Sequence, residues 1–484
     1  MSAHSLLPPS IDRLRGSFIG GTFRSTGVDL DVIDPASGEE LARLGSATPA
    51  ECLEAVDAAA EAAHLWAATS PRERARILRR ASEALLERSD EFATLITREN
   101  GKVLAEARAE VRYAADFLEW FSGEAVRVGG EFRTAPDGDK QIIVLPKPVG
   151  VALLITPWNF PAAMVTRKLG PALAAGCTVV VKPATETPLT ALAIAELFTN
   201  VGLPPGVLNV VVPTPPGPAV SQMLNHEAVR KISFTGSTAV GGELLRQAAP
   251  RALRSSMELG GNAPFIVTAR ASIDTAVEAA MVAKFRNGGA SCVAANRFYV
   301  HDSVADHFVS EFAARIRCLQ VGPGMDESSE VGPLISAAEG EKVRRTVQLA
   351  IDEGAVATAA DVDFRSGPWC PPTLLEGVQL DSSITKAEVF GPVAPIVRYS
   401  DSDDIVALAN SSESGLAAYV IDEDAGAALR LASCLEAGMV GINRGAISDP
   451  AAPFGGQKSS GLGKEGGFEG IEEYLERTYI AIEL

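Results

Sequence analysis

The stretch VALLITPWNFPAAMVTRKLGPALAAGCTVVVKPA, residues 151–184, decides the fold class. Two short apolar runs, VALLIT (151–156) and TVVVK (178–182), flank a segment with the spacing of a helix. Strands that lack a polar face are buried on both sides, as in a parallel sheet covered by helices. The stretch therefore predicts a β-α-β unit inside an α/β fold.

The same alternation extends over Val149–Glu258. A further helix is expected from Pro188, and further strands are expected at LNVVV (208–212) and KISF (231–234). From Leu259 to about Gly445 a second alternation predicts a second α/β domain. Its strands are expected at APFIV (263–267), RFYV (297–300), APIVRY (394–399) and AAYVI (417–421).

Three other segments complete the domain organisation. Residues 48–121 have helical periodicity, with Ser70 as a helix cap and Pro71 in the first turn. QIIVLPKPVG (141–150) and the terminal IEEYLERTYIAIEL have an extended pattern. These two segments are expected to pair with each other or with another subunit, and two separate solvent-facing strands are the alternative.

Composition restricts the classes of partner. A chain of 484 residues with 46% hydrophobic and 21% charged residues predicts two or three folded domains. The net charge of −18 disfavours nucleic acid and anionic membranes. The segment MSAHSLLPPSIDRLRG has no secretory pattern, and the six scattered cysteines form no CxxC pair. We expect a cytoplasmic protein that acts on a small molecule and holds no metal.

Two segments are candidates for dinucleotide binding. GLGKEG (461–466) matches G-x-G-x-x-G, but too little chain follows it for a β-α-β unit, so a turn is expected there. In KISFTGSTAVGGELL a strand ends at Phe234 and a helix begins near Thr238. Backbone N–H groups there, with the Ser237 hydroxyl, could face a pyrophosphate. An ordinary strand-turn-helix joint is the alternative.

Cys292 is the candidate nucleophile. It follows small residues in KFRNGGASCVAANRF, and Arg286 and Arg297 flank the segment. A positive environment would lower the pKa of the thiol and increase the reactive thiolate. The alternative is a buried, inert cysteine, which is the expectation for Cys177.

Glu258 and Asn159 are candidates for the remaining catalytic roles. Glu258 lies at the junction of the two α/β halves, where partial desolvation would raise the pKa of a general base. Asn159 follows the first sheet strand at its carboxyl end and could donate to an oxyanion. A glutamate at a strand end and a turn asparagine are the respective alternatives.

Several motifs occur together in the order of a known family. They are TPWNFP, VVKPA, FTGST, MELGGN, the Cys292 segment, EVFGPV (388–393) and PFGGQKSSGLGKEG. This arrangement resembles the aldehyde dehydrogenase superfamily over nearly the whole chain. Within it, KFRN and the ending GIEEYLERTYIAIEL resemble succinate-semialdehyde dehydrogenases. The resemblance implies a Rossmann-like cofactor domain, an α/β catalytic domain and a small bridging β-sheet in a homodimer or homotetramer. The corresponding ranges are 1–123 with 149–258, 259–445, and 124–148 with 446–484.

The resemblance also implies roles for individual residues. Cys292 would attack the aldehyde, Asn159 would hold the oxyanion, and Glu258 would activate water to hydrolyse the thioester. Arg167, Arg286 and Ser448 would bind the substrate carboxylate. NADP, or alternatively NAD, would be bound by Thr156, Trp158, Lys182, Thr185, Ser237, Glu388 and Phe390. Thr185 stands where NAD-preferring relatives often carry glutamate, which favours NADP unless Glu186 turns inward.

The chain also departs from the family pattern. Ala290 stands where the family commonly has glutamine, and Ala294 stands where relatives often have a second cysteine. Arg444 lies on the loop expected to border the substrate entrance, and it leaves the identity of the aldehyde open. Glutarate semialdehyde or a general aliphatic aldehyde is the alternative substrate. A CoA-acylating enzyme is a further alternative, which Glu258 at the general-base position disfavours. A non-catalytic homologue is another, which the presence of Cys292, Glu258 and Asn159 together disfavours.

Overall fold

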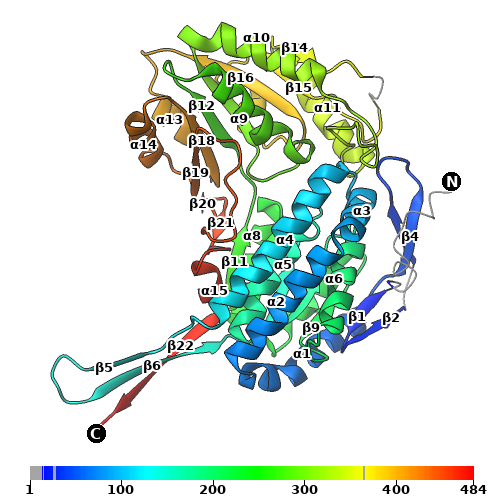
Figure 1. Ribbon diagram of the computed structural model, residues 1–484, viewed down its shortest axis with the longest axis vertical. Helices are drawn as coiled ribbons and strands as arrows, with labels where there is room; N and C mark the ends of the chain where they lie inside the picture. Colours follow the sequence, from blue (N-terminus) through cyan, green and yellow to red (C-terminus); the bar gives the residue numbers. More distant parts are fainter. Residues whose placement is uncertain (1–13, 15, 26–28, 363–365, 484) are drawn as a thin grey trace.

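The computed structural model describes residues 14, 16–25, 29–362 and 366–483. Most of the N-terminal segment MSAHSLLPPSIDRLRG, which shows no secretory pattern, lies outside the described residues. The described chain is an α/β protein built on two sheets, each with a parallel centre, and a separate antiparallel sheet that projects from one end (Figure 1). The predicted fold class is confirmed.

The first sheet contains the strands predicted around residues 151–184. Its order is β2-β1-β9-β8-β7-β10-β11-β21, and the pairs from β9 to β11 are parallel. The strands are β1 Ser17–Ile19, β2 Thr22–Arg24, β7 Val151–Ile155, β8 Thr178–Lys182, β9 Leu208–Val210, β10 Val229–Thr235, β11 Arg254–Glu258 and β21 Gly461–Leu462. β7 and β8 are buried along their whole length, as their apolar sequences predict.

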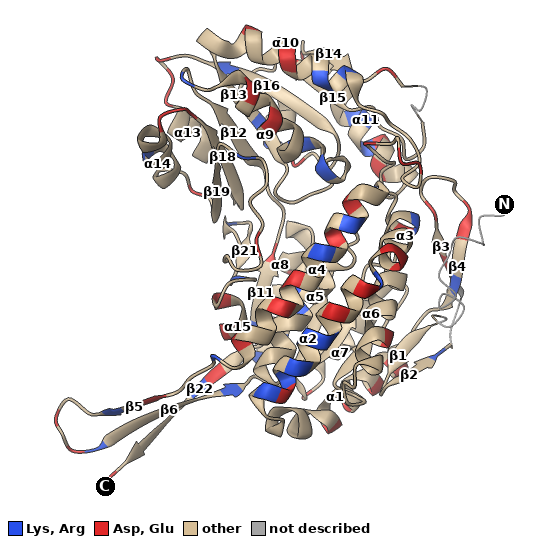
Figure 2. Ribbon diagram, viewed as in Figure 1, with Lys and Arg blue, Asp and Glu red and all other residues tan. Residues whose placement is uncertain are grey.

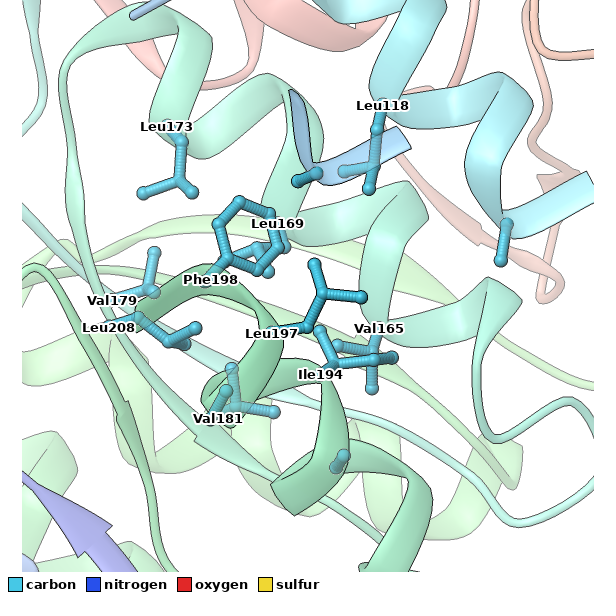
Figure 3. Close-up of a cluster of buried hydrophobic side chains, with 14 of the residues drawn as sticks. Leu118, Val165, Leu169, Leu173, Val179, Val181, Ile194, Leu197, Phe198 and Leu208 are labelled. Carbon is cyan, nitrogen blue, oxygen red and sulfur yellow. The ribbon is translucent and has the colours of Figure 1, made fainter. Parts of the chain in front are cut away.

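Helices cover both faces of this sheet. α5 Ala163–Ala175 and α6 Pro188–Asn200 pack on one face with the helices of the 71–125 region (Figure 1). Their apolar side chains interlock with those of β8 and β9 (Figure 3). The helix at 49–68 packs chiefly on the other face, with the helices at 216–225 and 238–248. The other helices here are α1 Pro49–Ala68, α2 Pro71–Glu87, α3 Ser89–Asn100, α4 Leu104–Ala125, α7 Pro216–Asn225 and α8 Thr238–Ala248.

Local sequence explains where these helices begin. Ser70 accepts a hydrogen bond from the backbone N–H of Glu73, and Pro71 opens α2, as predicted. Thr48 and Glu51 form a reciprocal capping box at the start of α1. Charged residues of both signs lie along the outward faces of α2 and α4 (Figure 2). Among the described helices, none is long and apolar enough to cross a bilayer.

The second sheet has the order β14-β15-β16-β13-β12-β18-β19 and is parallel from β15 to β19. Its strands are β12 Ala263–Val267, β13 Ala295–His301, β14 Val356–Ala359, β15 Thr373–Glu376, β16 Val393–Tyr399, β18 Ala417–Ile421 and β19 Met439–Ile442. The predicted second alternation is confirmed. Its main helices are α9 Ile273–Phe285, α10 Asp302–Cys318, α11 Ala337–Asp352, α13 Ile405–Asn410 and α14 Ala425–Ser433.

The two extended segments pair with each other, which confirms that expectation. β6 Gln141–Pro148 lies antiparallel between β5 Glu131–Thr134 and β22 Leu475–Ile482. This three-stranded sheet projects away from the body of the protein (Figure 1). Large apolar side chains on it are exposed, including Phe132 at 68% and Tyr479 at 55%.

The C-terminal segment takes part in more than the projecting sheet. Gly461 and Leu462, the start of the GLGKEG sequence, form strand β21 and pair antiparallel with β11. The prediction of a simple turn is therefore wrong for these two residues. Gly461 has φ +141°, and a Cβ there would lie 1.9 Å from the carbonyl oxygen of Met257. The close approach to β11 thus requires glycine at position 461.

Candidate active site

One cavity of about 250 Å³ opens between the two α/β halves. Its wall combines the ends of β7, β10 and β11 with the segment that precedes β13. In a parallel sheet the carboxyl ends of the strands meet at one edge, where ligands bind. The predicted residues that line it are Trp158, Asn159, Arg167, Ser237, Glu258, Arg286, Cys292, Glu388, Phe390 and Ser448.

Three predicted residues lie outside the lining of this cavity. Thr156 and Lys182 stand side by side after β7 and at the end of β8, since the Thr156 N–H donates to the Lys182 carbonyl over 3.1 Å. Thr185 follows on the next loop and is partly exposed. These residues form a neighbouring strip along the carboxyl edge of the sheet rather than a part of the cavity around Cys292.

Two glycines in the MELGGN motif permit the close packing of the site. A Cβ on Gly261 would lie 2.2 Å from the Cys292 carbonyl oxygen, and one on Gly260 would lie 2.5 Å from Oε2 of Glu388. The Gly261 N–H also donates to Oε1 of Glu388 over 3.2 Å. The glycines therefore let the chain after Glu258 contact the nucleophile segment and Glu388 together.

The predicted positive surroundings of Cys292 are only partly present. Arg297 is buried and donates to the carbonyls of Asn262 and Ala409, so it is a structural group. Burial raises the pKa of the Cys292 thiol to about 12, while Arg167 opposes the rise. The prediction of a lowered pKa is therefore wrong, because desolvation outweighs the attraction of Arg167. Cys177 is fully buried, as expected.

Glu258 is a buried carboxyl group facing the cavity. Among the described residues neither of its oxygens has a hydrogen-bond partner. Burial raises its pKa well above the ordinary value, and the nearby Glu465 raises it further. Glu465 itself pairs with the buried Lys168, whose ammonium also donates to Ser233 over 3.0 Å. The predicted desolvation of Glu258 is confirmed, and Lys168 and Glu465 are neighbours that sequence reasoning missed.

Asn159 is fixed by contacts that the sequence did not reveal. Its backbone carbonyl accepts from Lys102 Nζ over 2.8 Å and from Asn287 Nδ2 over 2.9 Å. Its side-chain Nδ2 donates to the Ala290 carbonyl over 3.0 Å. An amide nitrogen has two N–H donors, so one is left for a ligand in the cavity. The buried pair of Lys102 with Glu110 anchors this arrangement from α4.

The three residues predicted to bind the substrate carboxylate all line the cavity, but they differ in burial and in their contacts. Arg167 is 2% exposed, and its Nε and Nη1 make no hydrogen bond with any described residue. Arg286 is half-buried and lies over the ring of Phe160 at 5.8 Å. Ser448 lies on the loop after β19. Arg167 and Arg286 are thus two cations on the cavity wall that can face an anion, and Lys342 also lines the cavity.

Arg444 does not border this cavity. It is exposed and lines a separate open groove beside α9, together with Asp274, Glu278 and Asn443. Gly445 packs against α9, since a Cβ there would lie 2.1 Å from the carbonyl oxygen of Ala279. The loop that carries Arg444 and Gly445 borders the cavity further along the chain, at Ser448, as expected, although Arg444 itself is not part of the lining.

The remaining predicted residues are the candidates for cofactor binding. Phe390 and Trp158 meet edge to face with ring centres 5.4 Å apart. Ser237 caps α8 by accepting from the Val240 N–H over 3.4 Å. Burial lowers the pKa of Lys182, and the nearby Glu186 raises it. Glu186 itself is exposed at the surface.

A cysteine, a desolvated glutamate and an amide donor around one cavity define a site for covalent acyl chemistry. The family model described as aldehyde dehydrogenase family matches residues 23–480, and the chain belongs to that family. A succinate-semialdehyde dehydrogenase of Paenarthrobacter nicotinovorans is 51% identical over 444 residues, which cover 91% of this chain and 98% of the relative.

Two further comparisons bear on cofactor and substrate. A glutarate-semialdehyde dehydrogenase of Pseudomonas putida is 45% identical over 456 residues, covering 94% of this chain and 95% of the relative. A crystal structure described as an E. coli NADP dependent enzyme superposes with a TM-score of 0.95 at 45% identity. The superposition covers 98% of this chain and 99% of that chain.

Proposed function

We propose that this protein oxidises succinate semialdehyde to succinate with NADP. One observation carries the proposal: the buried guanidinium of Arg167, with Nε and Nη1 free of hydrogen bonds to described residues, lines the same cavity as Cys292 and Glu258. Such a cation favours an anionic group within the cavity, so a substrate with a carboxylate fits it. The name of the Paenarthrobacter relative supports the same substrate.

The chemistry follows from the three catalytic groups. The Cys292 thiol adds to the aldehyde: its sulfur bonds to the carbonyl carbon and its proton passes to the carbonyl oxygen, which gives a thiohemiacetal. The free N–H of Asn159 and the Cys292 backbone N–H stabilise the negative charge that develops on that oxygen. Oxidation leaves a thioester on Cys292. Glu258 then takes a proton from water, the resulting hydroxide attacks the thioester carbon, and the carboxylate product leaves the thiol.

The strip beside the cavity fits a dinucleotide. Lys182 and Thr156 offer an ammonium and a hydroxyl, Ser237 lies at the start of α8, and Glu388 and Phe390 reach the cavity near Cys292. A helix N-terminus presents backbone N–H groups to a phosphate. We assign the adenosine ribose to Lys182, the pyrophosphate to Ser237, the nicotinamide ribose to Glu388, and the nicotinamide ring to Phe390 with Trp158. When bound, the dinucleotide supplies the hydride acceptor.

Cofactor preference tests this assignment. Thr185 provides no carboxylate to repel a 2′-phosphate, and Glu186 is exposed. We expect kcat/KM for NADP to equal or exceed that for NAD. Thr185→Glu should shift the ratio toward NAD by at least tenfold. A wild-type preference of tenfold or more for NAD would overturn the assignment.

Arg286→Ala tests how the substrate is recognised. A charged hydrogen bond is worth roughly 1.5–3 kcal/mol, so we expect KM for succinic semialdehyde to rise at least about tenfold. KM for butyraldehyde, which has no carboxylate, should hardly change. Equal losses on both aldehydes would show that Arg286 supports the loop that precedes Cys292 rather than the substrate carboxylate.

Glutarate semialdehyde is the second candidate substrate. It also carries a terminal carboxylate, and the Pseudomonas putida relative is named for it. Comparing kcat/KM for the two semialdehydes separates them, since one methylene in a fitted pocket changes the ratio by roughly 10–200-fold. General aliphatic aldehydes would leave Arg167 without an anion. Glu258 in the cavity provides a general base for water, which favours hydrolysis of the thioester over transfer of the acyl group to coenzyme A.

We further propose that the projecting sheet joins two copies of this chain in a homodimer or homotetramer. Its exposed apolar side chains, Phe132, Leu145, Tyr479, Ile480 and Ile482, support this. We also propose the division into cofactor, catalytic and bridging domains at the expected limits. The six cysteines are free, which supports a reducing cytoplasmic location.

A further inference from the structure

Tyr113 on α4 contacts the substrate cavity and also holds the buried Arg167. The Tyr113 hydroxyl accepts a hydrogen bond from Nη2 of Arg167 over 2.8 Å. The side chain is partly buried and lines the cavity together with Arg167 and Cys292. Tyr113 therefore belongs to the wall of the site, although no motif in the sequence indicates it.

The Tyr113 hydroxyl has an uncommitted proton. A phenol oxygen can accept hydrogen bonds and donate one. Its contact with Arg167 uses an acceptor position, because a guanidinium can only donate. Among the described residues no acceptor receives the Tyr113 proton. A polar ligand in the cavity is thus the available partner for it.

The surroundings fix Tyr113 and Arg167 in one arrangement. The ring of Tyr113 packs on Phe117 with centres 4.8 Å apart. The guanidinium of Arg167 lies 4.0 Å from the ring centre of Phe454 and 3.9 Å from Glu465. Burial lowers the pKa of Arg167, but Tyr113, Glu465, Cys292 and Glu258 together raise it above its ordinary value. Arg167 remains charged, with two nitrogens still to be satisfied.

We propose that Tyr113 is a substrate-binding residue that donates its hydroxyl proton to the substrate carboxylate. In the same contact its oxygen accepts from Arg167 and orients the guanidinium toward that carboxylate. The anion is then held by a phenol O–H and by Nε or Nη1 of Arg167. This inference rests on the proposed function, because it requires a substrate with a terminal carboxylate.

Tyr113→Phe tests the proposal, because it retains the ring and removes only the hydroxyl. We expect kcat/KM for succinic semialdehyde to fall at least tenfold relative to butyraldehyde, chiefly through KM. The inhibition constant of the product succinate, measured against the semialdehyde, should rise by a similar factor. Tyr299→Phe is the matched control, since the Tyr299 hydroxyl also accepts from a buried arginine, Arg297, but lies outside the cavity. Its substrate ratio should match the wild type.

The outcomes separate this inference from the proposed function. A wild-type preference for succinic semialdehyde that Tyr113→Phe leaves unchanged would overturn the role of Tyr113 alone. Equal losses on both aldehydes, with the same melting temperature as the wild type, would also overturn it and assign Tyr113 to the cavity wall. A wild-type enzyme without a preference for the charged aldehyde would overturn the proposed function as well.

Discussion

Cys292→Ala should reduce the rate of dinucleotide reduction by at least ~10³-fold, since removing a covalent nucleophile commonly has an effect of this size or larger. Among the described residues, Cys292 is the only thiol that lines the cavity. Steady-state assays with succinic semialdehyde measure the loss. Dinucleotide binding, followed by fluorescence titration, should persist because the alanine leaves the adjoining strip unchanged.

Cys318→Ala is the matched control for this prediction. Cys318 is exposed at the end of α10 and does not line the cavity. Its activity should equal that of the wild type. Activity of Cys292→Ala within tenfold of the wild type would contradict covalent catalysis at this position.

Glu258→Gln should separate the two halves of the reaction. Reduced dinucleotide should form in a rapid burst, because Cys292 still forms the thioester, while steady turnover falls by about 10²–10⁴-fold for lack of a general base. Stopped-flow absorbance of the reduced dinucleotide measures both phases. If Glu258→Gln showed neither a burst nor turnover, Glu258 would be required for formation of the thioester and not only for its hydrolysis.

The same residue predicts a pH dependence in the wild type. Burial raises the pKa of Glu258, so the protonated form, which cannot accept a proton, persists to higher pH than for an exposed glutamate. Turnover should therefore increase as pH rises through this raised pKa, and Glu258→Gln should lack that increase. A kcat already at its plateau near the ordinary glutamate pKa of 4.5 would contradict the desolvated base.

The sheet strands could be predicted closely because burial leaves a local pattern in the sequence. TVVVK matches β8 from Thr178 to Lys182, and Pro188 opens α6 as expected. The pairing of β6 with β22 was one of the arrangements considered for the two extended segments, which lie far apart in the chain. The prediction that Glu258 and Cys292 share one site required the family resemblance, because sequence spacing alone does not show that two distant segments meet.

Long-range polar contacts could not be predicted from the sequence. Lys102 and Asn287 hold the carbonyl of Asn159, yet no sequence pattern connects either residue with Asn159, although Asn287 belongs to the KFRN motif. The pKa of Cys292 was mispredicted for a related reason. Nearby arginines in the sequence suggested a positive site, but Arg297 points into the core and burial dominates.

In the proposed mechanism, Cys292 carries the acyl group of a four-carbon semialdehyde until water activated by Glu258 hydrolyses the thioester. Glu258→Gln incubated with succinic semialdehyde and NADP, then digested and examined by mass spectrometry, tests this claim most directly. We expect one succinyl group on the peptide that contains Cys292, and none when the dinucleotide is omitted. An unmodified Cys292 peptide, or a succinyl group on another cysteine, would contradict the mechanism.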